Sequence, residues 1–286
     1  MSESQSAFVL GRLIIDNILV AFETLHHMQH QRRGKCGSMA LKLDMSKAYD
    51  RVEWQYLKCV MERMGFHPKW VSLMMECIST VSYSIMVNRE PHGYIQPLRG
   101  LRQGDPLSPY LFLLCAEGLH SLIQKAKLAG DHQGVSISRS GPKITHLFFA
   151  DDSLLFCKAK PVDVARIQDI LNDYEHASGQ HINRQKTTIF FSKSTPRRVQ
   201  ETIQGMLGVP AIKQYEKYLG LPSFIGRAKY STFTQIKEQV WSKLKGWKKK
   251  INVLNRKGSS HKICGPSNPN LCYELLSPPK TIDPGT

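Results

Sequence analysis

Two adjacent aspartates, Asp151 and Asp152, separate two apolar runs within residues 146–157. The pattern predicts two strands joined by a tight acidic turn, because apolar flanks favour a buried sheet and aspartate is a common turn residue. Most such pairs are ordinary hairpin turns. A chemical role would require further carboxylates nearby, because Mg²⁺ is usually held by one or two carboxylates together with substrate phosphates.

A third carboxylate, Asp44, follows an alternating segment, residues 39–43, that predicts a strand. Neighbouring strands lie about 5 Å apart, so this strand beside the hairpin would bring Asp44 to Asp151 and Asp152. Such a cluster of like charges is unfavourable unless cations are present. With two divalent ions it could hold the attacking and leaving oxygens of an in-line phosphoryl transfer. These residues therefore point to polymerase or nuclease chemistry.

The distribution of charge indicates a polyanionic partner. The formal net charge is +16, and it is concentrated in one part of the chain. Residues 1–183 contain 20 Lys and Arg against 18 Asp and Glu, whereas residues 184–262 contain 18 against 3. A solvated lysine surface is the simpler explanation, but so local an excess is more typical of a nucleic-acid contact.

The composition limits the class of protein. A chain of 286 residues with 41% hydrophobic content can form one large globular domain or two. No apolar run approaches the length of a membrane span, so we expect no membrane partner. The seven cysteines are scattered and form no Cys-x-x-Cys pair, which favours free thiols in a reducing, intracellular compartment.

The elements that must position the aspartates alternate irregularly. Helical spacing of apolar residues predicts helices over residues 8–28, 47–64, 68–78, 106–128, 163–177 and 231–250. Strands are predicted near residues 39–44, 83–87, 144–157, 187–191 and 218–222. Hairpins without a regular βαβ alternation predict an α+β domain.

Short motifs in this chain resemble those of reverse transcriptases. Residues 41–50 (LKLDMSKAYD), 100–109 (GLRQGDPLSP) and 149–152 (FADD) are similar to motifs A, B and C. Residues 179–186 (GQHINRQK) resemble motif D, and residues 218–222 (YLGLP) resemble the palm–thumb junction motif. Residues 5–9 and 11–17 are similar to the fingers segment that precedes motif A. The order of these motifs and their residues are most similar to those of plant non-LTR (LINE-type) retrotransposon polymerases, over about residues 5–250.

The resemblance implies a right-hand polymerase with fingers, palm and thumb, in which helices flank an antiparallel palm sheet. Partial fingers and palm would span residues 1–191. The palm–thumb junction and the basic thumb-like helices would span residues 192–250. The implied activity is RNA-directed DNA polymerisation, with an RNA template, a DNA primer, dNTP and two Mg²⁺ ions, for which Mn²⁺ can substitute. A retrotransposon protein of this kind is expected in nucleus and cytoplasm, and an endonuclease domain would once have been fused to it.

The resemblance also assigns roles to residues. Asp44 and Asp151 would be direct metal ligands, with Asp152 a weaker or indirect one. Tyr49 matches the steric gate that favours dNTP over rNTP, although its type alone suggests a packed core tyrosine. Asp50 would support the motif through a hydrogen bond or cap a helix.

Other assigned residues would contact the substrates. Gln103 and Gly104 match the motif B loop, which lies against the incoming nucleotide and template. Arg102 would contact phosphate, and a surface arginine is an equally good interpretation. Lys186 matches the lysine that protonates the leaving pyrophosphate, a position that sequence alone would place at the surface. Lysines on the thumb-like helix would grip the duplex backbone: Lys237, Lys243, Lys245, Lys248, Lys249 and Lys250.

The ends of the chain depart from the resemblance. Met1 stands inside the fingers segment, and the chain contains no upstream basic strand, endonuclease domain or Cys/His knuckle. Residues 251–286 do not match the apolar thumb helix of relatives, and Pro266 and Pro269 oppose a helix there. We hypothesise a frameshift near residue 257 and a poorly ordered tail. A catalytically inactive nucleic-acid-binding relic is the alternative function. A two-metal nuclease is disfavoured, because Tyr49 and Gln103 would have no role in it.

Overall fold

The computed structural model describes residues 1–31, 36–138, 141–209, 217–219, 221–222, 234, 237–238 and 241–242. The chain divides into two compact units, Met1–Gly226 and Arg227–Thr286. In the second unit the described residues have helical backbone, in agreement with the helix predicted over residues 231–250. The remaining positions of that helix and the predicted tail, residues 251–286, lie outside the described residues.

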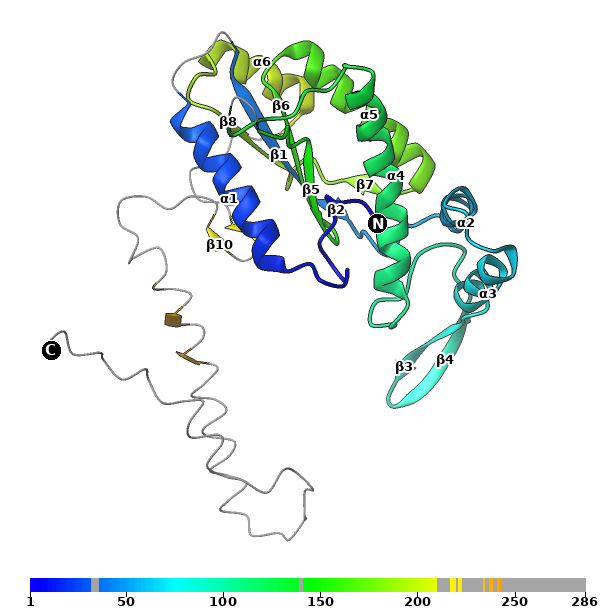
Figure 1. The fold of residues 1–286 in the computed structure, drawn as a ribbon. Helices are drawn as coiled ribbons and strands as arrows, with labels where there is room; N and C mark the ends of the chain where they lie inside the picture. Colours follow the sequence, from blue (N-terminus) through cyan, green and yellow to red (C-terminus); the bar gives the residue numbers. More distant parts are fainter. Residues whose placement is uncertain are drawn as a thin grey trace, which may run out of the picture. The chain divides into compact units, whose positions relative to one another are not determined.

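The first unit is built around a four-stranded antiparallel sheet in the order β5–β6–β1–β8 (Figure 1). Its strands are β1 (Ser38–Leu43), β5 (His146–Phe149), β6 (Asp152–Lys158) and β8 (Thr188–Phe191). Apolar runs and alternation predicted all four strands. The expected α+β class with an antiparallel sheet is therefore confirmed.

Helices cover both faces of the sheet, as Figure 1 shows. They are α1 (Ile14–His30) on one face, and α4 (Ser108–Leu128), α5 (Pro161–Ser178) and α6 (Arg197–Leu207) on the other. Side chains alternate across a strand, so neighbouring residues of β1 belong to different cores. Ala40 packs with Phe156 on the α1 side, whereas Met39 and Leu41 pack among residues of α4, α5 and α6.

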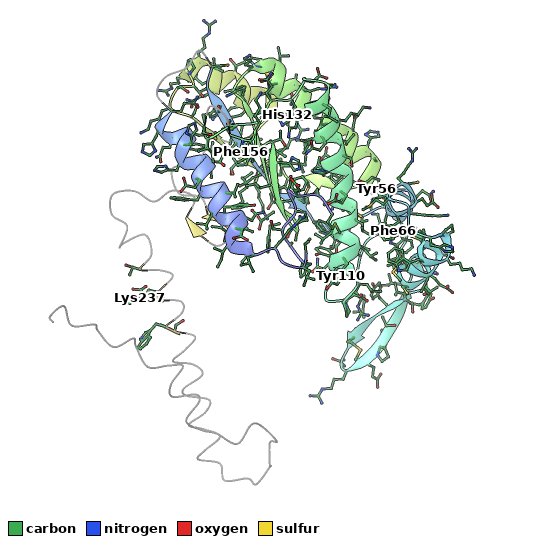
Figure 2. The ribbon with its side chains drawn as sticks, viewed as in Figure 1. Tyr56, Phe66, Tyr110, His132, Phe156 and Lys237 are labelled. Atoms are coloured by element: carbon green, nitrogen blue, oxygen red, sulfur yellow. The ribbon has the colours of Figure 1, made fainter. Side chains whose placement is uncertain are left out.

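A second helical part lies between β1 and α4 in the sequence. It comprises α2 (Trp54–Arg63), α3 (Pro68–Ser79) and the hairpin of β3 (Tyr83–Val87) and β4 (Glu90–Ile95). Leu57, Val71 and Phe112 belong to its separate core. The hairpin projects away from α3 in Figure 1 and is largely exposed. Tyr56 lies where α2 meets α4 (Figure 2). Its hydroxyl donates a hydrogen bond to the Cys115 carbonyl at 3.0 Å.

Three helices begin later than the sequence predicts. The helix predicted from residue 8 begins at Ile14, since Phe8 (φ +51°) and Gly11 (φ +77°) have backbone angles outside the right-handed helical region. The helix predicted from residue 47 begins at Trp54. The helix predicted from residue 106 begins at Ser108, although Asp105 accepts a hydrogen bond from a backbone amide, that of Leu107, as a cap would.

Several elements carry no clear sequence signal. Two short antiparallel pairs join β2 (Met45–Ser46) to β7 (His181–Ile182) and β9 (Lys217–Tyr218) to β10 (Leu221–Pro222). Strands of two residues are too short to show periodicity, so β2 and β7 were not predicted. By contrast, β9 and β10 overlap the strand and turn predicted over residues 218–222. In β4, Pro91 and Gly93 hide the strand pattern. The apolar spacing in α6 fits a helix, but Gly205 weakens it.

Two further observations concern the described part of the chain. There, no helix is long and apolar enough to cross a membrane. The described cysteines are free thiols: Cys36, Cys59, Cys77, Cys115 and Cys157.

A buried histidine cluster joins α4 to the sheet. His146 on β5 lies 2.8 Å from His120 on α4 (Nε2 to Nδ1) and 2.9 Å from the Thr145 hydroxyl. Burial lowers the pKa of His146 to about 3, and the charges of His120, His132 and Lys127 act in the same direction. Burial also lowers the pKa values of His120 and His132. The folded protein therefore keeps His146 neutral.

This cluster predicts a loss of stability in mild acid. The unfolded chain binds a proton at a histidine pKa of about 6.5 and the folded chain does not, so stability is complete above that pH and falls as the pH drops toward 3. The free energy of unfolding, measured with urea, should be lower at pH 5 than at pH 7.5 by on the order of a few kcal/mol, the size that such pKa shifts allow. His146→Gln should reduce this pH dependence, and His92→Gln, on exposed β4, should not. Equal stability at both pH values would contradict the prediction.

Candidate functional site

Asp44 stands at the end of β1, and neighbouring loops fix its backbone. Its amide donates a hydrogen bond to the Thr187 hydroxyl at 3.3 Å, and its carbonyl accepts one from the Asn183 amide at 2.8 Å. The half-buried Asp44 side chain is thus carried by a backbone held on both sides.

The acidic turn is a hairpin of two residues. Phe149 pairs with Asp152, so Ala150 and Asp151 form the connection between β5 and β6. Ala150 has φ +52°, whereas Asp151 does not have positive φ. This combination matches a type II′ hairpin turn, whose first central position favours glycine. It leaves Asp151 exposed at the tip and Asp152 half-buried at the start of β6.

The pairing of β1 with β6 brings the three aspartates together. Leu43 pairs with Ser153, which places Asp44 and Asp152 at the next position of the ladder. Partial burial raises the pKa of Asp152; Lys42 opposes this, and the charges of Asp151 and Asp44 raise it further. The register of β1 with β6 and the two-residue turn thus bring these carboxylates into one region, as the sequence predicted.

These carboxylates do not form a ready-made metal cage. Among the residues that the structure describes, no group of three or more His, Cys, Asp or Glu side chains could hold a metal ion. An ion bound here would need additional oxygen ligands. Substrate phosphates commonly supply such ligands to Mg²⁺.

Tyr49 lies between the acidic turn and α4. Its half-buried ring stacks on Phe112, with centroids 4.6 Å apart and an interplanar angle of 16°. Burial raises the pKa of Tyr49, and the charge of Asp151 adds to the effect, so the ring lies close to the turn. Tyr49 therefore packs on Phe112 as a core tyrosine would, and it also lies near the acidic turn.

The loop over residues 100–104 is fixed against the segment that follows Asp44. The amides of Gly100 and Leu101 donate to the carbonyls of Val52 and Tyr49, both at 2.8 Å. Gly100 has φ +92°, and a Cβ there would lie 2.7 Å from the Asp50 carbonyl oxygen. Only glycine meets both demands without strain. Because these carbonyls bind the loop, the helix predicted from residue 47 begins only at Trp54.

The exposed tip of this loop borders a cavity of about 660 Å³. Gln103 donates to Asp50 at 3.4 Å, and the Arg102 guanidinium lies 6.0 Å from the centre of the Tyr83 ring. Gly104 has φ +85°, and a Cβ added there would meet no atom of the described chain within 4 Å. Arg102, Gln103 and Asp50 all line the cavity.

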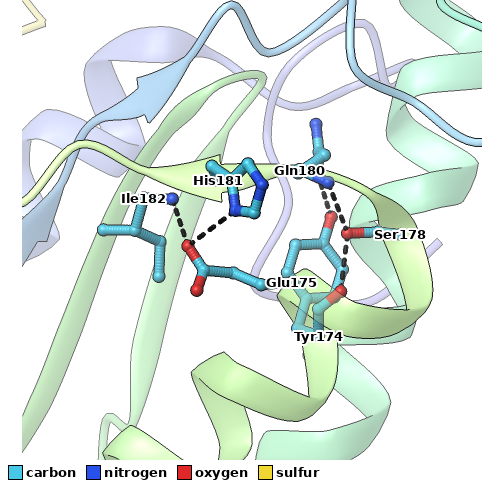
Figure 3. Close-up of polar contacts among 6 residues, drawn as sticks. All are labelled: Tyr174, Glu175, Ser178, Gln180, His181 and Ile182. Atoms are coloured by element: carbon cyan, nitrogen blue, oxygen red, sulfur yellow. Dashed lines mark hydrogen bonds and ion pairs between the residues drawn. The ribbon is translucent and has the colours of Figure 1, made fainter.

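The segment that resembles motif D, residues 179–186, is joined to Asp44 by a backbone hydrogen bond from Asn183. Figure 3 shows the end of α5, where Glu175 accepts from the Ile182 amide at 2.5 Å and lies 3.6 Å from His181. These contacts hold β7, which pairs with β2 directly after Asp44. Lys186 is exposed, and its amide donates to the Asn183 carbonyl at 3.1 Å.

The predicted basic helix belongs to the second unit. Lys237 is helical and exposed there. Lys243, Lys245 and Lys248–Lys250 lie outside the described residues.

Sequence reasoning missed three polar residues beside the turn. Gln5, Asn17 and Tyr218 are each buried and form hydrogen bonds that lead to β5 or the turn. Asn17 carried a usable signal, since it occupies an apolar helix position where a polar residue requires a partner. Gln5 had no such signal, because it precedes any periodic segment.

Comparisons with known proteins agree on the kind of domain. A family model described as reverse transcriptase (RNA-dependent DNA polymerase) matches residues 1–223. A Xenopus laevis protein of transposon TX1 is 28% identical over 257 residues, which are 89% of this chain and 19% of that protein. The Pol polyprotein of the type-1 retrotransposable element R2 from Popillia japonica is 29% identical over 205 residues, 68% of this chain and 32% of that protein.

A mitochondrial protein of Arabidopsis thaliana is 52% identical over 68 residues, 24% of this chain and 56% of that protein. The chain thus spans less than two thirds of each of these relatives. Two telomerase structures from Candida tropicalis, both 12% identical over 77% of this chain, have TM-scores of 0.52 and 0.51. The matches cover 39% and 32% of the two telomerase chains and show that the fold is shared. The polymerase fold implied by the sequence motifs is confirmed.

The Gly100 contact predicts a specific loss of stability. Gly100→Ala should lower the free energy of unfolding by about 3 kcal/mol, because it adds a steric clash to the strain of positive φ. Gly65→Ala is the matched control, since Gly65 has φ +81° and open space around it. It should lose only about 1–2 kcal/mol. Urea unfolding measures both, and equal losses would show that the Asp50 contact contributes nothing.

Proposed function

Because the chain belongs to the reverse transcriptase (RNA-dependent DNA polymerase) family, we propose that its acidic turn is the centre of an RNA-directed DNA polymerase. In this reaction the primer 3′-hydroxyl attacks the α-phosphorus of a dNTP, the bond between the α- and β-phosphates breaks, and a deoxynucleoside monophosphate is added with release of pyrophosphate. The observation that carries this proposal is the ladder position of Asp44 beside Asp152. Tyr49 and the loop over residues 100–104 complete the surroundings that a nucleotide requires.

The proposed cofactor is a pair of Mg²⁺ ions, for which Mn²⁺ would substitute. Carboxylate oxygens suit hard cations, and the incomplete protein ligand set leaves positions for substrate phosphates. Asp44 and Asp151 would hold the ions, with Asp152 as a weaker or indirect ligand. When bound, two such ions stabilise the attacking and leaving oxygens of an in-line displacement.

The residues around the carboxylates would orient the substrates. The exposed position of Asp151 at the turn gives a triphosphate access, and the doubly held backbone of Asp44 keeps its carboxylate in place. Lys186 is exposed on the loop joined to Asp44, where an ammonium group could donate a proton to the leaving pyrophosphate. Pre-positioned groups of this kind account for much of enzymatic rate enhancement.

Tyr49 is proposed as the gate that excludes ribonucleotides. Stacking on Phe112 fixes its ring, and a fixed ring beneath the sugar would clash with a 2′-hydroxyl. A mobile side chain could move aside and would discriminate poorly. The role therefore depends on the ring and not on the hydroxyl.

The cavity beside the loop is proposed to receive the templating strand and part of the nucleotide. Arg102 supplies a positive charge for phosphate, and Gln103 supplies an amide. Lys237 and the lysines that follow it would contact the backbone of the duplex. The R2 and TX1 relatives support a non-LTR retrotransposon as the source of the RNA template.

Primer extension on an RNA template tests the proposed activity. Asp151→Asn keeps the size of the side chain but removes its charge, so it should lower dNTP incorporation by about a hundredfold or more. Asp173→Asn, on an exposed position of α5, is the matched control and should remain active. Template binding without synthesis in the unaltered chain would favour an inactive relic, and strand cleavage without synthesis would favour a nuclease.

The gate is tested by the ratio of kcat/KM for dNTP to that for rNTP. Tyr49→Ala should lower this ratio by about tenfold, because the clash with the 2′-hydroxyl disappears. Tyr49→Phe keeps the ring and should keep the ratio. An unchanged ratio in Tyr49→Ala would remove the gating role.

A further inference from the structure

The acidic turn has a backbone that needs external support. Ala150 adopts φ +52°, a region that costs a non-glycine residue about 1–2 kcal/mol. Asp151 is exposed and directly precedes a second carboxylate, Asp152. Strained positions persist only when surrounding contacts determine them. The contacts that hold this turn therefore decide where its carboxylates lie.

The first support comes from the N-terminal segment. Residues 4–6 run parallel to β5: the Phe148 amide donates to the Ser4 carbonyl at 2.8 Å, and the Ser6 amide donates to the Phe148 carbonyl at 3.1 Å. The side chain of Gln5, only 1% exposed, accepts from the Ala150 amide at 3.4 Å. Gln5 thus contacts the strained residue itself.

The arrangement of Gln5 is energetically demanding. Its Oε1 also accepts from the Ala7 amide at 2.9 Å, while its buried Nε2 has no hydrogen-bond partner within the described part of the chain. An unsatisfied buried donor is unfavourable, so its presence calls for an explanation. Arg12 donates to the carbonyls of Ser2 and Gln5 and so keeps the segment in place.

The second support is Asn17 on α1. Its Nδ2 donates to the Phe148 carbonyl at 3.0 Å and to the Ser6 hydroxyl at 3.2 Å. Asn17 is 3% exposed, so water cannot easily replace these bonds. One amide group therefore joins the helix, the N-terminal segment and the strand that leads into the turn.

Tyr218 completes a path from the other end of the unit. Its hydroxyl donates to the Asn17 Oδ1 at 2.8 Å, which fixes the orientation of the Asn17 amide and directs Nδ2 to β5. Burial raises the pKa of Tyr218, and the charge of Asp152 adds to this, so the hydroxyl stays protonated. Gln5 and Asn17 thus contact the backbone at Ala150 and Phe148 directly, and Tyr218, which stands 201 residues after Asn17, acts through Asn17.

We propose that Gln5, Asn17 and Tyr218 are positioning residues that set the backbone of the acidic turn, with Asn17 as the central member. Through this path, the placement of residues 217–218 determines the position of Asp151 and Asp152. The kinetic consequence rests on the proposed polymerase activity, whereas the structural consequence does not.

The structural consequence is tested by hydrogen–deuterium exchange of the full chain. Tyr218→Phe removes one hydroxyl and leaves the ring, so the chain should fold while the amides of residues 149–152 exchange about tenfold faster. Tyr56→Phe is the matched control, because it also removes a hydroxyl that donates a hydrogen bond, in this case to the Cys115 carbonyl. It should leave exchange in the turn unchanged. Unchanged exchange of the turn in Tyr218→Phe would overturn the proposal.

Asn17→Ala provides a second, stronger variant. It removes both the donor to Phe148 and the acceptor for Tyr218, so it should increase exchange in the turn more than Tyr218→Phe does. Combining Asn17→Ala with Tyr218→Phe should add little, because the two residues act along one path. Additive effects in the double variant would show that they act independently and would refute the path.

The kinetic consequence is tested in the primer-extension assay. Tyr218→Phe should lower kcat by about tenfold with the KM for dNTP changed less than about twofold, since the reacting groups are misplaced while nucleotide contacts remain. Mere loss of stability would reduce the active fraction of Tyr56→Phe as well. Equal kcat losses in the two variants would reject the positioning role. A chain that shows the exchange effect without any DNA synthesis would support the path and refute the polymerase.

Discussion

The pairing of β1 with β6 is the constraint on which the rest of the site depends. Its register, from Ser38 opposite Lys158 to Leu43 opposite Ser153, decides which residue stands beside Asp152. A slip of one residue would turn Asp44 to the other face of the sheet, because side chains alternate along a strand. The packing opposes this slip, because it would move the small Ala40 into the core that Met39 and Leu41 fill and the larger side chains into the core on the other face.

The surrounding loops attach to the backbone that leaves this strand. Asn183 and Thr187 bind the main chain of Asp44, and Leu101 binds that of Tyr49. Segments that are distant in sequence thus converge on residues 44–52. Backbone hydrogen bonds are suited to this task because they fix position without depending on side-chain identity. The identities of the aspartates, Tyr49 and Gln103 remain available for chemistry.

The strands of the sheet and most of the candidate site could be predicted from the sequence, because both leave strong local patterns. Apolar runs on each side of Asp151 and Asp152 mark a hairpin, and Asp44 follows a strand with clear alternation. The start of α2 could not be predicted, since residues 47–53 fit a helix locally but bond to the loop at Gly100 and Leu101. Gln5 and Tyr218 were missed for the same reason: their partners lie more than a hundred residues away along the chain.

The parallel pairing of residues 4–6 with β5 also affects how the sheet meets its surroundings. A strand at the edge of a sheet exposes unpaired amides and carbonyls that can recruit strands from other molecules. The N-terminal segment covers this side of β5, and the opposite edge is β8, a strand of only four residues. Short edge strands offer little to a foreign strand. The first residues of the chain therefore also protect the protein against edge-to-edge aggregation.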